Sequence, residues 1–263
     1  MIGVHIGLKK SGSSSIQTFL SANQKALGQL GVDYPRVGRG SFNAHHNFPW
    51  ELMDRPKFIP RRGGLDELSR YLQKERAPVC LLSSEMFEGC ATDQVARFRD
   101  VLREHDDQVR VILYIRNLVS LMPSSYAQKV KHGKHAYDFD AFFAERMSHI
   151  RTDYFMTAEA WASAFGWEAI RVRPLEPERL VNGDLIDDLL ESLDLDPNAP
   201  AARALARPGI VNPAPGWRVL EAIRGLANGR HGLAADHPLA RVDKSDPAGN
   251  AGGRIACGVI TAD

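Results

Sequence analysis

Short apolar runs of strand length alternate with segments of helical periodicity through most of this sequence, and that alternation constrains the fold more than any other feature. The runs that we expect to form strands are Ile2–Gly7, Pro78–Ser84, Val109–Ile115 and Glu168–Pro174. Helical spacing follows the first run over 13–30 and returns over 184–193. Strands that alternate with helices are typical of a parallel sheet flanked by helices on both faces, so the sequence predicts an α/β fold.

One domain over residues 1–263 is the expected organisation, because a chain of 263 residues with 44% hydrophobic content can bury a substantial core. The stretch 36–64 is rich in Pro, Gly, Asn, Arg and His and has little periodicity. Long loops of this type are often functional. From about residue 229 to 263 the chain is rich in Gly, Pro and Asn, and we expect an atypical, poorly ordered tail there.

The charge balance of 33 Lys and Arg against 32 Asp and Glu argues against nucleic acid or an anionic membrane as a partner. Three cysteines without C-x-x-C spacing favour a reducing compartment and form no readable metal site. The chain begins with a strand-like run and has no apolar run long enough to span a bilayer, so we expect neither a signal peptide nor a membrane span. Together these features predict a cytoplasmic protein.

The turn after the first strand, in the segment HIGLKKSGSSSIQ, places a lysine, a glycine and several serines just before a helix. Ser11 or Ser13 is a candidate cap, and the open amides of a first helical turn favour an anion. Gly12 lets a ligand approach the backbone, and Lys10 adds positive charge. A capped turn with a solvated lysine is the alternative. The fold expected is P-loop-like, although the nucleoside-triphosphate P-loop has its lysine after the second glycine.

A second anion-binding feature follows the strand Val109–Ile115. Arg116 comes directly after that strand, and ligands of open α/β sheets bind beyond the carboxyl ends of the strands. Ser124 comes eight residues later, next to Pro123, which we expect to start a new helical segment. An arginine and a serine at a helix start suit a phosphate group, while pairing of Arg116 with a surface carboxylate is the alternative. Two anion sites on adjacent strand ends indicate a nucleotide with phosphates at both ends.

At these residues the sequence resembles the sulfotransferases that use 3′-phosphoadenosine 5′-phosphosulfate, and in particular a bacterial branch of that superfamily. The similar segments are HIGLKKSGSSSIQTFL, LLSSEMF, YIRNLVSLMPSSYAQKVKHG and IRVRPLEPERLVNGDLIDDLL, and the resemblance covers about 2–228. The phosphosulfate loop of the family is matched by Gly7, Lys10, Ser11, Gly12, Ser13 and Ser14, and its 3′-phosphate signature by Arg116 and Ser124. Serines replace the more usual threonines of the loop. In the tail, Arg230 and Arg254 are candidates for a late basic segment.

The resemblance implies transfer of a sulfuryl group from this donor to a hydroxyl or amine of an acceptor, with adenosine 3′,5′-bisphosphate as the product and no metal. It implies that Lys10 stabilises the leaving oxygen while the amides of 12–14 hold the 5′ phosphate. Glu85, at the end of a strand, is the favoured base, and His46 beside His45 is the second candidate. The alternatives are an ion pair of Glu85 with Lys10 or Arg116, and ordinary loop roles for the two histidines.

The acceptor class stays open at this point, with a carbohydrate or a lipid as candidates. Phe48, Trp50 and Phe58 in the irregular stretch either line an acceptor cleft or form a small satellite core. The charged cluster EPERL and the pair Arg61 and Arg62 are expected on solvated faces. Two other functions remain as alternatives: a magnesium-dependent P-loop kinase or nucleotide hydrolase, and a non-catalytic module that binds a nucleotide.

Overall fold

The computed structural model of the chain describes residues 1–8, 10–40, 43–74, 77–131, 139–147 and 154–207. These residues fall into two compact units. The first unit holds the described residues of 1–118 and 154–207, and the second holds those of 119–147. The single domain over 1–263 stays a prediction, and the tail expected from about residue 229 lies outside the described residues.

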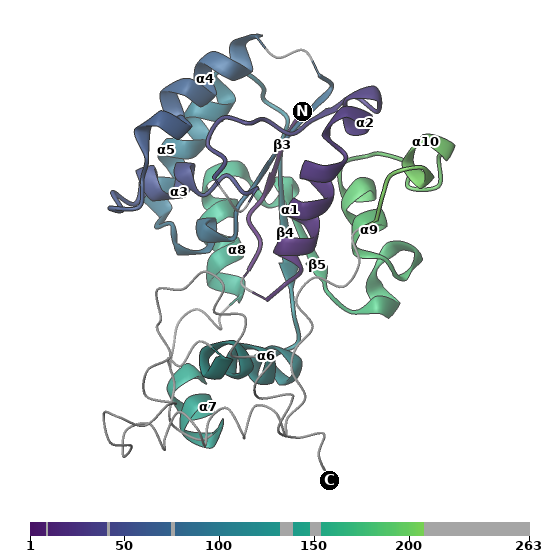
Figure 1. The fold of residues 1–263 in the computed structure, drawn as a ribbon. Coiled ribbons are helices and arrows are strands. Elements are labelled where there is room, and N and C mark those ends of the chain that lie inside the picture. Colours follow the sequence, from purple (N-terminus) through teal and green to yellow (C-terminus); the bar gives the residue numbers. More distant parts are fainter. Residues whose placement is uncertain (9, 41–42, 75–76, 132–138, 148–153, 208–263) are drawn as a thin grey trace, which may run out of the picture. The chain divides into compact units, whose positions relative to one another are not determined.

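A five-stranded sheet, parallel throughout and ordered β2-β3-β1-β4-β5, forms the centre of the first unit (Figure 1). Its strands are β1 (Ile2–His5), β2 (Val32–Asp33), β3 (Val79–Ser83), β4 (Val109–Ile115) and β5 (Ile170–Pro174). Four of them were expected, whereas β2 was missed because two residues carry no periodicity. β1 lies between β3 and β4, with His5 in register with both Ser83 and Ile112. The carboxyl ends of these three strands are therefore neighbours.

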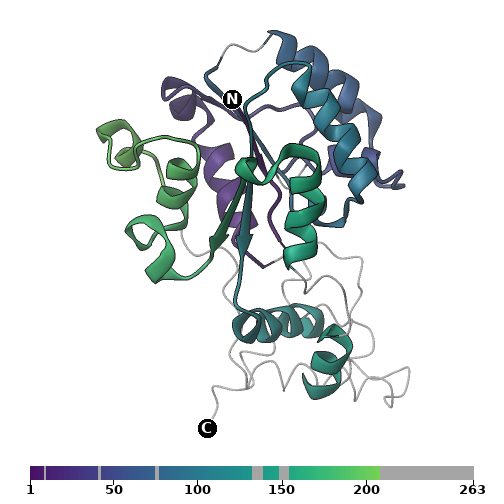
Figure 2. The same ribbon diagram turned by 180° about the vertical axis from the view of Figure 1, so that it is seen from behind.

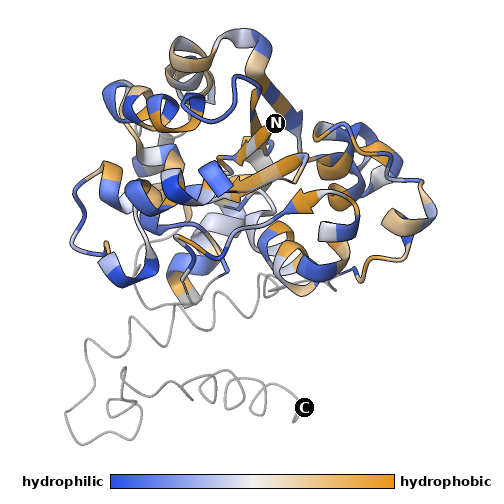
Figure 3. Cartoon of the chain, turned by 90° about the horizontal axis from the view of Figure 1, so that it is seen from above, coloured by the Kyte–Doolittle hydropathy of each residue, from blue (hydrophilic) through white to orange (hydrophobic). Residues whose placement is uncertain are grey.

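Helices cover both faces of the sheet, which confirms the predicted α/β class (Figures 1 and 2). One face packs against α3 (Asn47–Leu52), α4 (Leu65–Lys74), α5 (Thr92–Arg103) and α8 (Tyr154–Phe165). The other face packs against α1 (Ser13–Ala22), α2 (Gln24–Gln29), α9 (Leu185–Ser192) and α10 (Pro200–Arg203). Within β3 and β4, Leu82 and Val111 belong to the first core and Leu81 and Ile112 to the second. Figure 3 shows the strands as mainly hydrophobic and the helices as mixed.

Two of the expected helices differ from the sequence prediction. The segment 13–30 forms α1 and α2, separated at Asn23, whose side-chain amide donates to the carbonyls of Phe19 and Ala206 at 2.9 Å. In addition, α6 (Leu118–Lys131) contains Pro123 in its interior, so the prediction that Pro123 starts a helix was wrong. A proline removes a backbone hydrogen bond from the helix interior, and this helix of 14 residues keeps its other turns around it.

The remaining elements of the chain are short. The irregular stretch 36–64 contains α3 and the 3₁₀ helix η1 (Pro60–Arg62), and the other 3₁₀ helices are η2 (Glu85–Gly89), η4 (Trp167–Ala169), η5 (Pro177–Arg179) and η6 (Val181–Gly183). In the second unit, α6 packs against α7 (Phe139–Met147) through Tyr126, whose ring lies 5.4 Å from that of Phe139 and 5.5 Å from that of Phe142. Within the described ranges, every helix falls short of the length and hydropathy that a bilayer span requires.

Candidate functional site

Three candidate site segments follow the three central strands and meet at one edge of the sheet. The loop of residues 7–12, called the opening loop below, follows β1, Ser84 and Glu85 follow β3, and Arg116 follows β4. The Arg116 guanidinium crosses to the opening loop, where Nη1 donates to the Lys10 carbonyl at 3.3 Å. The carbonyl of Arg116 in turn accepts the Tyr154 hydroxyl at 2.7 Å. The tertiary structure thus joins two basic segments that lie more than a hundred residues apart in the sequence.

The opening loop enters α1 through two left-handed residues, Lys10 with φ 69° and Gly12 with φ 80°. Gly12 is the N-cap of α1, and no side chain caps the helix. The predicted cap by Ser11 or Ser13 was therefore wrong, since Ser13 Oγ donates instead to the Leu8 carbonyl at 3.3 Å. A glycine accepts the left-handed conformation that an N-cap serine would avoid.

The start of α1 leaves several polar groups without a protein partner. Within the described ranges, no hydrogen bond engages the backbone amides of Gly12, Ser13 or Ser14. The Ser11 hydroxyl is fully buried and likewise has no partner among the described residues. Open amides at a helix N-terminus, combined with the helix dipole, attract anions. The arrangement is thus suited to holding phosphate or sulfate oxygens.

Two glycines allow the opening loop to pack closely against the rest of the fold. A Cβ on Gly7 would lie 2.5 Å from Ser13 Oγ and 2.8 Å from His5 Nε2. A Cβ on Gly12 would lie 2.5 Å from a methyl group of Leu185 in α9. The left-handed φ of Gly12 and the buried His5 ring beside Gly7 favour glycine at both positions.

The two candidate bases lie beside each other. Glu85 Oε2 accepts the side-chain amide of Gln17 in α1 at 2.9 Å, and Glu85 Oε1 lies 3.7 Å from His46 Nε2. His46 Nδ1 lies 2.8 Å from the Ser84 hydroxyl. Burial lowers the pKa of His46, and the Glu85 carboxylate partly offsets this effect. Among the described residues, the partners of Glu85 are thus Gln17 and His46, rather than Lys10 or Arg116.

His45 has a structural position next to this pair. Its ring is fully buried, with Nδ1 accepting the Ser83 backbone amide at 3.0 Å and Nε2 lying 2.9 Å from the Pro35 carbonyl. Because Nδ1 accepts, the ring proton is on Nε2 and is donated to Pro35. Burial lowers the pKa of His45 to about 3, so this histidine is neutral near pH 7. These two hydrogen bonds attach the irregular stretch 36–64 to β3 and so fix the position of the neighbouring residue His46.

Arg116 also lines a cavity of about 640 Å³ at the ends of β4 and β5, together with Tyr154, Arg173 and Arg179. Arg173 forms an ion pair with the buried Asp188 of α9. Arg179 belongs to the EPERL cluster and is exposed, as expected of a solvated face. That it also lines the cavity of Arg116 was not predicted, because nothing in the local pattern separates such an arginine from others on the surface.

Ser124, the other half of the predicted 3′-phosphate signature, lies in the part of α6 that belongs to the second unit. Its pairing with Arg116 stays a prediction. Arg230 and Arg254, the candidates for a late basic segment, lie outside the described residues. Of the candidate anion-binding groups, the first unit thus holds Lys10, Arg116 and the amides of 12–14.

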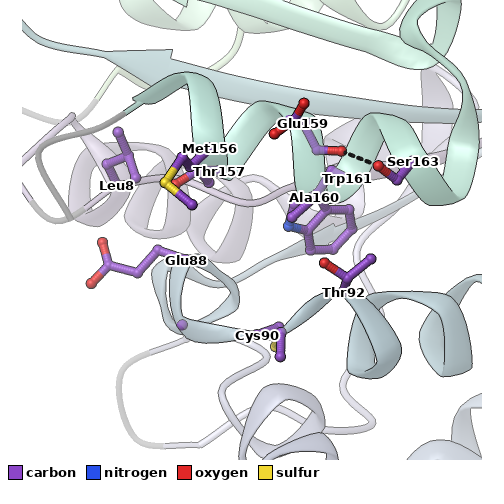
Figure 4. Close-up of a pocket in the computed structure, with 12 residues that line it drawn as sticks. Leu8, Glu88, Cys90, Thr92, Met156, Thr157, Glu159, Ala160, Trp161 and Ser163 are labelled. Atoms are coloured by element: carbon purple, nitrogen blue, oxygen red, sulfur yellow. Dashed lines mark hydrogen bonds between the residues drawn. The ribbon is translucent and has the colours of Figure 1, made fainter. Parts of the chain in front are cut away.

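A cleft of about 560 Å³ lies between η2 and the start of α5 on one side and α8 on the other. Figure 4 shows Glu88, Cys90 and Thr92 on the first side, facing Met156, Thr157 and Trp161 on α8, with Leu8 of the opening loop at one end. The described part of the lining combines apolar surface with hydroxyl groups and the carboxylates of Glu88 and Glu159. Such a cleft suits a ligand that has both an apolar part and hydrogen-bonding groups.

The aromatic residues of the irregular stretch have different positions. Phe48 is fully buried in the main core and does not line the cleft, so it supports the core interpretation. Trp50 is half-buried, and its ring packs against that of His46 at 5.4 Å between centroids. Trp50 therefore lies against His46, one of the two candidate bases, whereas Phe48 is part of the core.

Comparison with known proteins gives similarity to solved structures only at a distant level. No protein-family model and no curated protein sequence matches the chain. Among solved structures, a sulfotransferase from Alicyclobacillus acidocaldarius aligns over 80% of this chain and 86% of its own, with 15% identity and a TM-score of 0.49.

Proposed function

We propose that this protein is a sulfotransferase that moves a sulfuryl group from 3′-phosphoadenosine 5′-phosphosulfate to a hydroxyl or amine of an acceptor. The observation that carries the proposal is the convergence of Lys10, Arg116 and the open amides of 12–14 at the carboxyl ends of β1 and β4. A group transfer between charged oxygens depends mainly on such positioning and charge stabilisation. The sequence motifs that resemble the superfamily coincide with these residues.

In this proposal the opening loop holds the phosphosulfate end of the donor. The amides of Gly12, Ser13 and Ser14 donate to the 5′ phosphate. Lys10 stabilises negative charge on the bridging oxygen as the S–O bond to the phosphate breaks. Arg116, with Arg179 in the adjacent cavity, offers a guanidinium group to the phosphate at the other end of the nucleotide.

The acceptor side of the reaction requires a base and a binding cleft. Glu85 removes the proton from the acceptor oxygen or nitrogen as that atom forms its bond to sulfur, and the products are a sulfated acceptor and adenosine 3′,5′-bisphosphate. His46, at 3.7 Å from Glu85, is placed to take up the proton afterwards. No step requires a metal ion.

The cleft beside η2 is the proposed acceptor site, because its lining includes Leu8 of the opening loop and Glu88 of η2. Residues three apart in a 3₁₀ helix lie on the same side, so Glu88 is on the same side of η2 as Glu85. A carbohydrate or lipid acceptor remains the proposed class, and the cytoplasm remains the proposed compartment.

Calorimetric titration with adenosine 3′,5′-bisphosphate in the absence of magnesium tests the proposal. We expect micromolar binding to the wild type and at least tenfold weaker binding to Lys10→Ala and Arg116→Ala. Lys74→Ala and Arg70→Ala, which change exposed residues of α4, are matched controls and should bind as the wild type does. Absence of binding, with ATP and magnesium binding instead, would favour a kinase or nucleotide hydrolase. Binding of the donor without transfer to any acceptor would favour a non-catalytic module.

A further inference from the structure

The buried residue His5 lies at the end of β1 and contacts Ser83 of β3 and Gly7 of the opening loop. Its side chain is completely shielded from solvent, and burial lowers its pKa to about 4, so the imidazole is neutral near pH 7. Tyr114 packs against the ring edge-on, with 5.9 Å between centroids. A polar ring held in this way in the centre of a sheet requires hydrogen-bond partners to be stable.

One side of the His5 ring leads to Glu85 through a series of hydrogen bonds. His5 Nδ1 lies 2.8 Å from the Ser83 hydroxyl, and the Gln17 amide donates both to Ser83 Oγ at 3.4 Å and to Glu85 Oε2 at 2.9 Å. A serine hydroxyl can accept two hydrogen bonds and donate one, so Ser83 Oγ can bond Gln17 and His5 Nδ1 at the same time.

The other side of the ring faces the opening loop. His5 Nε2 has no partner among the described residues, and it lies so close to Gly7 that a Cβ there would be 2.8 Å away. The Ser13 hydroxyl borders the same glycine. His5 therefore touches the segment that binds the donor and, through Ser83 and Gln17, the residue that takes the proton.

We propose that His5 is a positioning residue, which holds Ser83 so that Gln17 fixes the Glu85 carboxylate relative to the opening loop. This inference rests on the proposed sulfuryl transfer. His5 itself exchanges no proton with the substrate. Its contribution is the orientation of Glu85, so its loss should lower the turnover number and leave nucleotide binding almost unchanged.

The test uses the full chain and the release of sulfate from the donor to water, an acceptor that is always present. Ser83→Ala and His5→Leu should each lower kcat about 5- to 10-fold, as expected for the loss of one buried hydrogen bond. The dissociation constant of adenosine 3′,5′-bisphosphate should stay within about twofold. His5→Asn, which keeps a polar atom near Ser83, should restore most of kcat. Because both residues act through one chain of hydrogen bonds, the double variant should lose no more than either single one.

Ser69→Ala is the matched control, because Ser69 Oγ also bonds a histidine, His105, at 2.8 Å, but on α4 and away from the sheet edge. It should leave kcat unchanged. The ¹⁵N shift of His5 Nδ1 gives a second measurement that needs no turnover, and it should change in Ser83→Ala and stay unchanged in Ser69→Ala.

Several results would overturn the inference. They are a wild-type kcat in Ser83→Ala and His5→Leu, rescue by His5→Gln instead of His5→Asn, equal losses in Ser69→Ala, or an Nδ1 shift that Ser83→Ala leaves unchanged. A wild type that neither binds the bisphosphate nor releases sulfate would instead refute the proposed function, and the inference with it.

Discussion

Acid should destabilise this fold through the buried side chain of His45. The folded chain holds His45 neutral, because Nδ1 accepts the Ser83 amide and Nε2 donates to Pro35 within a fully buried site. A proton added at His45 Nδ1 would face the backbone N–H of Ser83, so two donors would meet and this hydrogen bond would be lost. Burial lowers the pKa of His45 to about 3, whereas an unfolded chain has the ordinary value of 6.5.

The size of the effect follows from proton linkage. Between pH 6.5 and pH 3 the unfolded chain binds the proton and the folded chain does not, so the free energy of unfolding falls as the pH is lowered through this range. At about 1.36 kcal/mol per pH unit, the step from pH 7 to pH 5 removes about 2 kcal/mol through His45. That loss is a large part of the stability of an ordinary domain.

Urea unfolding of the wild type and of His45→Asn at both pH values measures this effect. The variant is less stable at pH 7, but its loss between pH 7 and pH 5 should be about 2 kcal/mol smaller than that of the wild type. Tyr34→Phe is the control, because Tyr34 packs edge-on against His45 at 4.8 Å between centroids and does not titrate in this range. Tyr34→Phe should lower the free energy of unfolding by the same amount at pH 7 and at pH 5. Equal pH dependence in the wild type and in His45→Asn would refute the assignment of a neutral, doubly bonded His45.

Three further predictions concern the site. Lys10→Ala should lower the rate of sulfuryl transfer about 10²- to 10³-fold, which single-turnover measurements would detect, and near-normal turnover would rule out its role at the leaving oxygen. Glu85→Gln should abolish most transfer and His46→Ala should slow it less; the reverse order in steady-state assays would make His46 the base. Gly12→Ala should cost about 1–3 kcal/mol in urea unfolding, because of the left-handed φ of 80° and the contact with Leu185, and an unchanged midpoint would contradict this packing.

The sequence alone was sufficient for the class of fold and for the candidate residues that follow the strands. Apolar runs of strand length and helical periodicity are local signals, and four strands were predicted from them. Parallel strands bring their carboxyl ends to one edge, so the residues that follow the strands, Lys10, Glu85 and Arg116, were correctly expected to lie at one edge of the sheet.

The tertiary structure decided how those residues are arranged. That β1 lies between β3 and β4 is a matter of strand pairing, which no local pattern encodes. Only this pairing places the Arg116 guanidinium on the Lys10 carbonyl and Ser83 beside His5. Likewise, the partners of Glu85 come from positions 17 and 46, on a helix and in an irregular stretch that a reading of neighbouring residues cannot connect. The sequence determined which groups follow the strands, whereas non-local packing determined which of them hold one another in place.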